Sequence, residues 1–552
     1  MNARWGSFAL LALALLGFSA DVLDRSAHQL SPRYDEVSYL ALARDYAHEG
    51  GFVPTIRCHL EARCKEDNRP PLYELMIAAV IDDSPAAYAR AKLVSYGTAL
   101  LLLAMVFVVV RRLFSPTVAL GSVVALALMP ALSDFSSHVQ HDTLYAAITF
   151  AAIFAMASWQ ARGVGWWLLT GALVGLAFLT KGSGHLLFLP LLGVSFYTHR
   201  WSLWRKPILY AAACGFVAVS FFLLVRNIKL AGSPFFNVNG RGIWLDKWQD
   251  VWALQLDPEW KRVGLGWYLE RHSMLQLVLK VLRGLGLTIG VSVYAAGIGF
   301  ATPALRALAG VCVLVVAGFG VRRRWQDGHK VEVLAVLSTW MLFAAALSLA
   351  TSGGPGPQAR YCFPYVTLLV PYFVAEVVER LWPWLEARAM PRILQKRTGM
   401  PSAHTGLALV ALLLATRFAF AAPALRHDPL SLYAVEPNWH RTSLWLGQHL
   451  AAGESFALPY QSLYSTWDVP RPQTDTRWNF WYGMPEAELR RYLDGSHIQH
   501  LLVDTAAAGF AEYATKLSAS KDGHGPLAFL DWPRCFADDA QPSRFLVFCR
   551  PL

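Results

Sequence analysis

The run AKLVSYGTALLLLAMVFVVV, residues 91–110, decides the fold class of this chain. It has the length of a bilayer-spanning helix, its single charged residue is Lys92, and Arg111 and Arg112 follow at once. Similar runs recur along the 552 residues, of which 55% are hydrophobic and 16% charged. This composition is too apolar for an ordinary soluble protein and predicts a polytopic α-helical membrane protein.

Eleven spans follow from these runs, with twelve or thirteen as alternatives. They lie at 8–23, 91–110, 117–132, 143–159, 166–180, 184–197, 208–225, 303–321, 333–350, 361–378 and 405–422. The first run resembles a signal peptide, but cleavage after Ala20 would place Phe18 where a small residue is needed, so we interpret it as a span. We expect the apolar run 277–300 to form an interfacial or re-entrant helix, because a further span would place two basic clusters outside.

Basic clusters between the spans predict the orientation of the chain. The net charge is +11, but the basic residues lie in short clusters between apolar runs, which argues against nucleic acid as a partner. The positive-inside rule then predicts a cytoplasmic N-terminus. Residues 1–422 would form the transmembrane catalytic domain, with external loops at 24–90 and 226–302. Residues 423–552 have the composition of a soluble domain and would form a small external α/β domain, with helices near 443–452 and 511–516 and strands at 500–503 and 544–549.

The external loop 24–90 holds the first candidates for chemistry. Tyr34, Asp35 and Glu36 open its polar part, at the start of an amphipathic helix near 37–47, and Pro70 and Pro71 precede a second helix near 72–81. Acidic residues in a first helical turn also have an ordinary structural explanation, because the helix dipole favours them there.

A third carboxylate and four basic residues lie at the predicted external ends of spans. Asp142 stands at the mouth of an apolar helix, where a buried carboxylate is costly and indicates a cavity. The basic residues are candidate phosphate ligands, with snorkelling to the interface as the alternative. They are Arg69, Lys181, Arg226 and Arg360.

Metal ligands and disulfides are the remaining sequence signals. His138, His141 and Asp142 are too few for a metal site, so we predict no metal and no cofactor, without excluding a divalent ion. Two pairs of cysteines lie close together in polar regions, and we interpret them as disulfides of an oxidising compartment, with reduced thiols as the alternative. The pairs are Cys58 with Cys64 and Cys535 with Cys549.

Together these motifs resemble those of the polyprenyl-phosphate-sugar-dependent glycosyltransferases of the GT-C superfamily, near families 39 and 83. Those families include protein O-mannosyltransferases and the lipid A aminoarabinose transferase. The matching residues are Tyr34-Asp35-Glu36 with Tyr39, Ala43 and Gly50-Gly51; Arg69-Pro70-Pro71-Leu72-Tyr73; His141-Asp142; Leu179-Thr180-Lys181-Gly182; and Arg360-Tyr361-Cys362-Phe363-Pro364.

The resemblance assigns roles to several of these residues. Asp35 would be the catalytic base or the acceptor-binding residue, supported by Glu36, and Asp142 would be a second functional acid. Arg69 would help to bind the lipid phosphate, at a position that is usually lysine in such enzymes. We add Tyr73 and Tyr361 to the substrate-binding candidates, because they lie in the matched motifs.

The implied reaction is an inverting transfer of a sugar from an undecaprenyl (polyprenyl) phosphate carrier. The acceptor would be lipopolysaccharide or lipid A, another envelope glycan or a protein, on the periplasmic face of a bacterial inner membrane. Asp35 would act as a base for a hydroxyl acceptor and as a positioning group for a phosphate acceptor. A flippase or transporter of lipid-linked saccharides is the alternative function, and it predicts ionisable residues in mid-membrane and pseudo-symmetric halves.

Overall fold

The structure, a computed structural model, describes most of residues 3–384 and parts of the remainder. It leaves out 30–31, 33–34, 65–68, 83–85, 159–162, 247–261, 299–302 and 352–358, and beyond 384 it describes 441–442, 445–446, 448–449, 455–459, 477–480, 490–491, 493–494, 498–504, 532–537 and 545–550. The predicted span 405–422 and helix 511–516 lie outside the described residues, as does Tyr34, and the helix 443–452 lies largely outside them.

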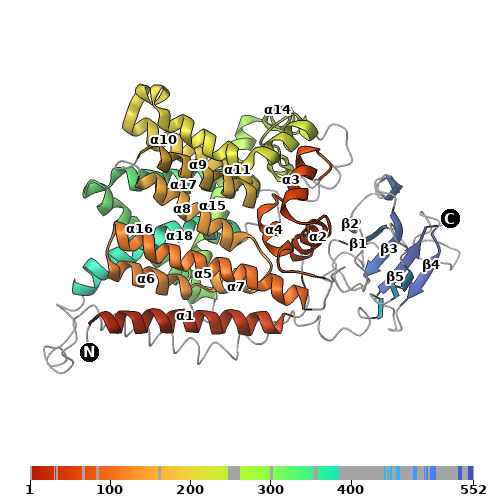
Figure 1. Cartoon of the computed structure of the whole chain (residues 1–552), viewed down its shortest axis with the longest axis horizontal. Helices are drawn as coiled ribbons and strands as arrows, with labels where there is room; N and C mark the ends of the chain where they lie inside the picture. Colours follow the sequence, from red (N-terminus) through yellow and green to blue (C-terminus); the bar gives the residue numbers. More distant parts are fainter. Residues whose placement is uncertain are drawn as a thin grey trace.

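Helices make up the described part as far as residue 384, and strands appear only beyond it (Figure 1). The helices as far as residue 231 are α1 (Ala3–His28), α2 (Asp35–His48), α3 (Phe52–Leu60), α4 (Leu72–Ala78), α5 (Ala87–Leu113), α6 (Pro116–Ala127), α7 (Pro130–Ser137), α8 (Asp142–Ala157), α9 (Val164–Thr180), η2 (Gly182–Leu187), α10 (Phe188–His199), η3 (Arg200–Arg205) and α11 (Pro207–Ala231). The later ones are α12 (Val238–Gly242), α14 (Leu265–Leu269), α15 (Met274–Ala296), α16 (Pro303–Gln326), α17 (Lys330–Thr351), α18 (Ala359–Glu376) and η5 (Val377–Leu381).

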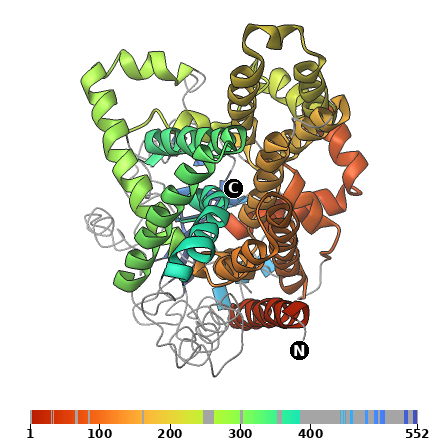
Figure 2. The same ribbon diagram turned by 90° about the vertical axis from the view of Figure 1, so that its left-hand side faces the viewer.

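The polytopic helical fold is confirmed by the apolar helices of the bundle. Among the described residues, α5, α11, α15, α16, α17 and α18 are each long and apolar enough to cross a bilayer. The pair α6 and α7 forms a further candidate, bent by 62°, and α8 and α9 are shorter apolar helices. The first predicted span lies within α1. Figure 2 views this bundle from the end at which the N-terminus lies.

Helix α15 covers most of the run for which we predicted an interfacial or re-entrant helix. Its length and composition would allow a span, and it packs against α16, α17 and α18. Gly284 lies so close to Ser348, in the last turn of α17, that a Cβ would stand 1.8 Å from the Ser348 carbonyl oxygen. One turn later, Cys362 Sγ in the first turn of α18 contacts the Thr288 carbonyl at 3.8 Å. Helix α15 thus contacts the last turn of α17 and the first turn of α18 about one turn apart along its own length, and whether it is interfacial stays a prediction.

Three short helices fill the loop between α1 and α5. Gly50 and Gly51 separate α2 from α3 with φ values of 97° and 84°, a backbone region that glycine adopts without steric cost. Pro71 is the residue before α4, where its fixed φ suits a helix start. Helices α2 and α4 pack against each other, which brings the two ends of the loop together.

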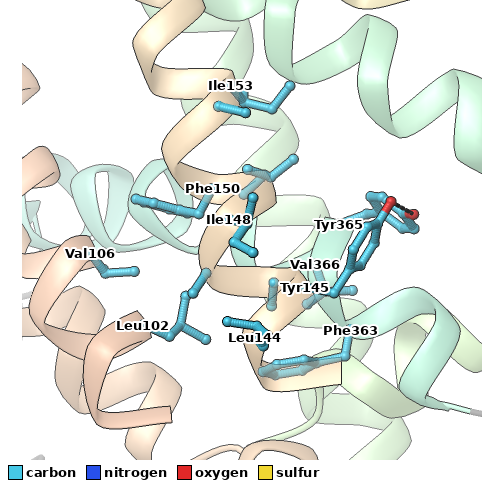
Figure 3. Packing of buried hydrophobic residues seen from close by; sticks show 14 of the residues in the cluster. Leu102, Val106, Leu144, Tyr145, Ile148, Phe150, Ile153, Phe363, Tyr365 and Val366 are labelled. Atoms are coloured by element: carbon cyan, nitrogen blue, oxygen red, sulfur yellow. Dashed lines mark hydrogen bonds between the residues drawn. The ribbon is translucent and has the colours of Figure 1, made fainter. Parts of the chain in front are cut away.

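The hydrophobic core lies between α5, α8 and α18 (Figure 3). It includes Leu102 and Val106 of α5, Leu144 and Phe150 of α8, and Phe363 and Val366 of α18. The Tyr145 and Tyr365 hydroxyl oxygens, 3.3 Å apart, add a polar contact between α8 and α18. This packing holds the first residue of α8, Asp142, near the beginning of α18.

Close packing of glycines joins α9 to α11. A Cβ on Gly171 would stand 1.8 Å from the Ala212 carbonyl oxygen, and one on Gly215 would stand 2.0 Å from the Leu168 carbonyl oxygen. Small residues at such contacts are typical of helix pairs in membranes, because they let two backbones approach. The pair positions Arg226, near the end of α11, relative to Lys181, which follows α9.

Beyond the bundle lies a five-stranded sheet with the order β2-β1-β3-β5-β4. Its strands are β1 (Ser455–Pro459), β2 (Arg477–Phe480), β3 (Ile498–Asp504), β4 (Arg534–Ala537) and β5 (Phe545–Cys549). β1 pairs in parallel with β2 and β3, whereas β5 is antiparallel to β3 and β4. The predicted strands 500–503 and 544–549 correspond to β3 and β5. In Figure 1 the sheet lies at the end of the bundle that carries α2 to α4, away from the N-terminus.

Candidate active site

Asp35 joins three segments that are far apart in the sequence. It is the first residue of α2, and its carboxylate oxygens contact two guanidinium groups, with Oδ1 at 2.9 Å from Arg69 Nη2 and Oδ2 at 2.6 Å from Arg360 Nη1. Arg69 stands just before α4, and Arg360 lies in the first turn of α18. The Asp35 side chain is 31% exposed, so the centre of this ion-pair cluster remains accessible.

The two guanidinium groups determine the ionisation of Asp35. Burial alone would raise the pKa of the carboxyl group, but the positive charges of Arg360 and Arg69 outweigh it and hold the pKa well below its ordinary value. Asp35 is therefore ionised at neutral pH, and it is a weak base as long as both arginines contact it.

A second ion pair lies beside the first. Lys181 Nζ donates to Asp142 Oδ1 at 3.1 Å, and the Asp142 side chain is fully buried. Tyr361 connects the two pairs, because Arg360 Nη2 donates to its hydroxyl at 2.9 Å and Lys181 Nζ lies 4.6 Å from its ring centre. Within the part of the chain that the structure describes, Asp142 Oδ2 has no hydrogen-bond partner.

Tyr39 and His141 complete the wall of the cluster. Tyr39 follows Asp35 by one helical turn, and its ring lies 5.4 Å from the Arg69 guanidinium carbon. Its hydroxyl lies 2.5 Å from Nδ1 of His141, the residue before α8. Both residues lie in motifs matched in the sequence, but neither was given a role there. The spacing of four residues could have indicated one for Tyr39, because it places Tyr39 on the same helix face as Asp35.

Glu36 lies apart from the ion-pair cluster, although it adjoins Asp35 in sequence. Successive residues of an α-helix point about 100° apart, and the buried Glu36 carboxylate accepts hydrogen bonds from Gln29 Nε2 at 2.7 Å, Tyr88 Oη at 3.1 Å and the Val139 backbone N–H at 2.6 Å. The last bond ties α2 to the segment that carries His141 and Asp142.

Tyr73 is buried behind the cluster. Its hydroxyl lies 2.5 Å from Ser95 Oγ, and its ring meets those of Tyr39 and His141 edge to face, at 5.6 Å and 6.3 Å between centres. Burial raises the pKa of Tyr73 well above its ordinary value, so the phenol stays protonated. The Tyr73 ring therefore supports Tyr39 and His141, and its hydroxyl is bonded to Ser95.

Arg226 lies in a neighbouring pocket instead of at Asp35. Its Nε donates to the Cys64 carbonyl at 2.9 Å and its Nη1 to Asn227 Oδ1 at 3.0 Å. The pocket is lined by Arg69, Pro70, Phe178, Gly182, Leu223, Arg226, Asn227, Phe236 and Asn237. Arg69 thus lines this pocket and also binds Asp35, so pocket and ion-pair cluster adjoin.

Both cysteine pairs form disulfides, Cys58 with Cys64 at the end of α3 and Cys535 with Cys549 between β4 and β5.

Burial, with Arg226 nearby, lowers the pKa of His59 to about 3, so this histidine is neutral. Two groups of described residues have metal-like geometry, but each consists of one histidine and the two cysteines of a disulfide. Disulfide sulfurs are not thiolate ligands.

Comparison with known proteins agrees with this architecture. Residues 68–225 match the family model of dolichyl-phosphate-mannose-protein mannosyltransferases. No match is found among curated proteins. The crystal structure of ArnT from Cupriavidus metallidurans bound to undecaprenyl phosphate superposes with a TM-score of 0.58 at 14% sequence identity, covering 99% of this chain and 98% of that chain.

A second solved structure is the oligosaccharyltransferase AglB from Archaeoglobus fulgidus, in complex with an inhibitory peptide and a dolichol-phosphate. It superposes with a TM-score of 0.54 at 14% identity, covering 93% of this chain and 72% of that chain. Both proteins have the GT-C fold. The chain therefore has this fold, as its motifs predicted.

Proposed function

We propose that the protein transfers one sugar, with inversion, from a polyprenyl phosphate carrier to an acceptor of the bacterial envelope. The observation that carries the proposal is the Asp35 cluster, in which a partly exposed carboxylate is held between two arginines beside a second acid and a lysine. The bound undecaprenyl phosphate of ArnT and dolichol-phosphate of AglB support a polyprenyl phosphate as the carrier.

The charge of the cluster suits a phosphodiester. Three cations, Arg69, Lys181 and Arg360, face two carboxylates, Asp35 and Asp142, which leaves one positive charge. A sugar linked to a carrier through a phosphodiester brings one negative charge and would neutralise it. Guanidinium groups are well suited to bind its two free oxygens, because they donate two parallel hydrogen bonds.

Arg69 and Arg360 would also neutralise the leaving group. When the bond between sugar and phosphate breaks, the carrier phosphate gains negative charge, and donors fixed in advance around it stabilise the transition state. Arg69 would reach the phosphate from the side of the pocket that it shares with Arg226. Arg226 would act there by holding the Cys64 carbonyl, which lies shortly before Arg69 in the sequence.

Asp35 would change its basicity when the donor binds. In the free protein both carboxylate oxygens are bound by arginines, which makes them poor proton acceptors. A phosphate that draws Arg69 and Arg360 towards itself would weaken those ion pairs and raise the pKa of Asp35 towards its ordinary range. The carboxylate would then accept the proton of an acceptor hydroxyl as it attacks the sugar.

The acceptor would be lipid A or another part of lipopolysaccharide, another glycan or a protein, in the periplasm of a bacterium. In this arrangement the N-terminus is cytoplasmic, residues 1–422 form the membrane-embedded catalytic domain, and the domain of residues 423–552 is periplasmic. α2 to α4 and the sheet lie at the end of the bundle away from the N-terminus, which supports this orientation (Figure 1).

Complementation of cells that lack the gene tests the proposal. Mass spectrometry of envelope lipids, glycans and proteins should reveal a missing sugar that the wild-type gene restores. Asp35→Asn should be inserted normally but restore none of it. Asp82→Asn, in the same loop and paired with Arg90 on the surface, is the matched control and should restore it fully. Normal product with Asp35→Asn would overturn the assignment.

A further inference from the structure

Two consecutive residues in the wall of the Asp35 cluster each have a buried polar atom without a hydrogen-bond partner among the described residues. Among the described residues, His141 Nε2 and Asp142 Oδ2 make no hydrogen bond, although both atoms are shielded from solvent. Native structures rarely leave buried donors and acceptors unpaired, because each would lose its bonds to water without replacement. Two such atoms on consecutive residues indicate a place that a ligand completes.

The contact between Tyr39 and His141 defines which of these atoms donates. Burial raises the pKa of Tyr39 well above its ordinary value, so the phenol carries its proton. Burial also lowers the pKa of His141 to about 4, so the imidazole is neutral and has one N–H. Within the described residues, the bond to His141 Nδ1 is the one that the Tyr39 hydroxyl makes. With Tyr39 donating, Nδ1 accepts and the single proton of His141 is on Nε2.

We propose that His141 Nε2–H and the carboxylate of Asp142 form the binding site for the hydroxyl groups of the donor sugar, with Tyr39 as the residue that positions His141. The inference rests on the proposed function, since it places the sugar beside the phosphate-binding arginines. His141 touches the sugar, and the Tyr39 hydroxyl acts through its bond to His141.

The chemistry of the two atoms favours a sugar over a phosphate. A phosphate oxygen could accept from Nε2–H but would be repelled by the neighbouring Asp142 carboxylate. A hydroxyl group both accepts and donates, so the hydroxyl groups of a sugar satisfy His141 and Asp142 together. Lys181 already binds the other oxygen of Asp142, which keeps this carboxylate ionised and its free oxygen available as an acceptor.

An acceptor glycan would offer the same hydroxyl chemistry, and geometry favours the donor. Asp142 and His141 are connected to Arg360 through Lys181 and Tyr361, so they border the cations that would hold the carrier phosphate. The sugar of the donor is bonded to that phosphate and must lie next to it. The proposed site therefore contacts the sugar of the donor.

Binding measurements without acceptor isolate this contact. The full-length protein in nanodiscs is titrated with undecaprenyl phosphate and with undecaprenyl phosphates that carry a hexose, a pentose or an amino sugar. The wild type should bind one of the glycosylated carriers more tightly than the bare carrier. His141→Phe should weaken binding of that donor roughly 10-fold and leave binding of undecaprenyl phosphate unchanged, which also shows that the variant is folded.

Three further variants make the result specific. Tyr39→Phe should weaken donor binding by roughly 3-fold, because the histidine loses the bond that fixes its proton. His141→Gln places an amide N–H near the position of Nε2 and should recover part of the affinity, whereas His141→Asn, whose amide lies near Nδ1, should not. Asp82→Asn should match the wild type in every titration.

The possible failures are distinguishable. If the wild type binds no glycosylated carrier more tightly than the bare carrier and transfers no sugar, the proposed function fails and this inference with it. If the wild type discriminates and His141→Phe keeps the difference, the sugar site alone is wrong. If His141→Phe binds the donor normally but has a raised KM for the acceptor, the donor-sugar site is also wrong, and the contact belongs to the acceptor.

Discussion

Clusters of arginine and carboxylate lie at both ends of α18, and they differ in a way that separates function from stability. At one end Asp35 is bound by Arg69 and Arg360, is 31% exposed and adjoins buried atoms that have no partner among the described residues. At the other end Glu332, whose side chain is 6% exposed, accepts from Arg324 Nη2 at 2.8 Å and from Tyr372 Oη at 2.7 Å.

The positive and negative charges cancel in the cluster of Arg324 and Glu332 but not in the Asp35 cluster. Arg324 and Glu332 neutralise each other, Arg324 also donates to the Leu113 carbonyl, and its guanidinium lies 4.3 Å from the Phe114 ring centre. This set ties α5, α16, α17 and α18 together and has no surplus charge for a ligand. The Asp35 cluster has one positive charge in excess and accessible groups. An excess of positive charge at a solvent-accessible site indicates that the Asp35 cluster binds an anion. The neutral, buried pair of Arg324 and Glu332 indicates a role in stability.

The largest expected effect comes from removing one arginine at each end. Arg360→Gln should lower the rate of sugar transfer by roughly 100- to 1,000-fold, because a donor aimed at the developing charge is lost. Arg324→Gln should leave transfer per folded molecule within about 2-fold but lower the melting temperature, because Glu332 becomes a buried unpaired charge. Transfer assays and thermal unfolding on both purified variants check this. Similar losses of activity in the two variants would break the comparison.

The pH dependence of stability gives a smaller effect. Asp35→Asn should lower the melting temperature, since the two guanidinium groups lose the charge between them. The pKa of Asp35 is depressed in the folded protein, so its contribution is complete above the ordinary aspartate pKa and is lost as the pH falls through the depressed one. The difference in melting temperature between wild type and variant should therefore stay constant from pH 8 to about 5. A difference that shrinks over this range would show a raised pKa.

The sequence predicted more of the fold than of the site. Apolar runs are local and of bilayer length, so the helices around 91–110 or 208–225 follow directly from composition. Asp35 and Arg69 belong to one external loop, which the sequence indicated as the first candidate for chemistry. Arg360 lies far away in the sequence, and only the resemblance to GT-C enzymes connected it with Asp35.

The sequence did not show in which direction the side chains of the candidate site residues point. Asp35 and Glu36 looked alike as neighbouring acids, but the helix turns Glu36 towards Gln29, Tyr88 and the Val139 N–H. Arg226 looked like a phosphate ligand, yet it donates to the Cys64 carbonyl. Such differences depend on how distant segments pack, and no local pattern reports them.

The smallest expected effect concerns the disulfide that lies between the two ends of the loop. Cys58 and Cys64 close the end of α3, where Arg226 and Lys229 bind the carbonyls of Cys64 and Leu60 at 2.9 Å and 2.7 Å. Arg69 follows Cys64 closely in the chain, so a looser end of α3 should place its guanidinium less accurately. Replacing both cysteines by serine should raise the KM for the donor by about 3-fold, with kcat little changed, because uniform binding is lost.

The matching pair in the sheet provides the control for this prediction. Replacing Cys535 and Cys549 by serine removes a bond of the same kind between β4 and β5. It should destabilise the sheet by about 2 kcal/mol and leave the KM for the donor unchanged, because among the described residues neither cysteine contacts the Asp35 cluster. Donor kinetics and thermal unfolding on the two double variants check both expectations. Equal increases in KM would mean that the disulfides act through overall stability, and the first one would then have no part in positioning Arg69.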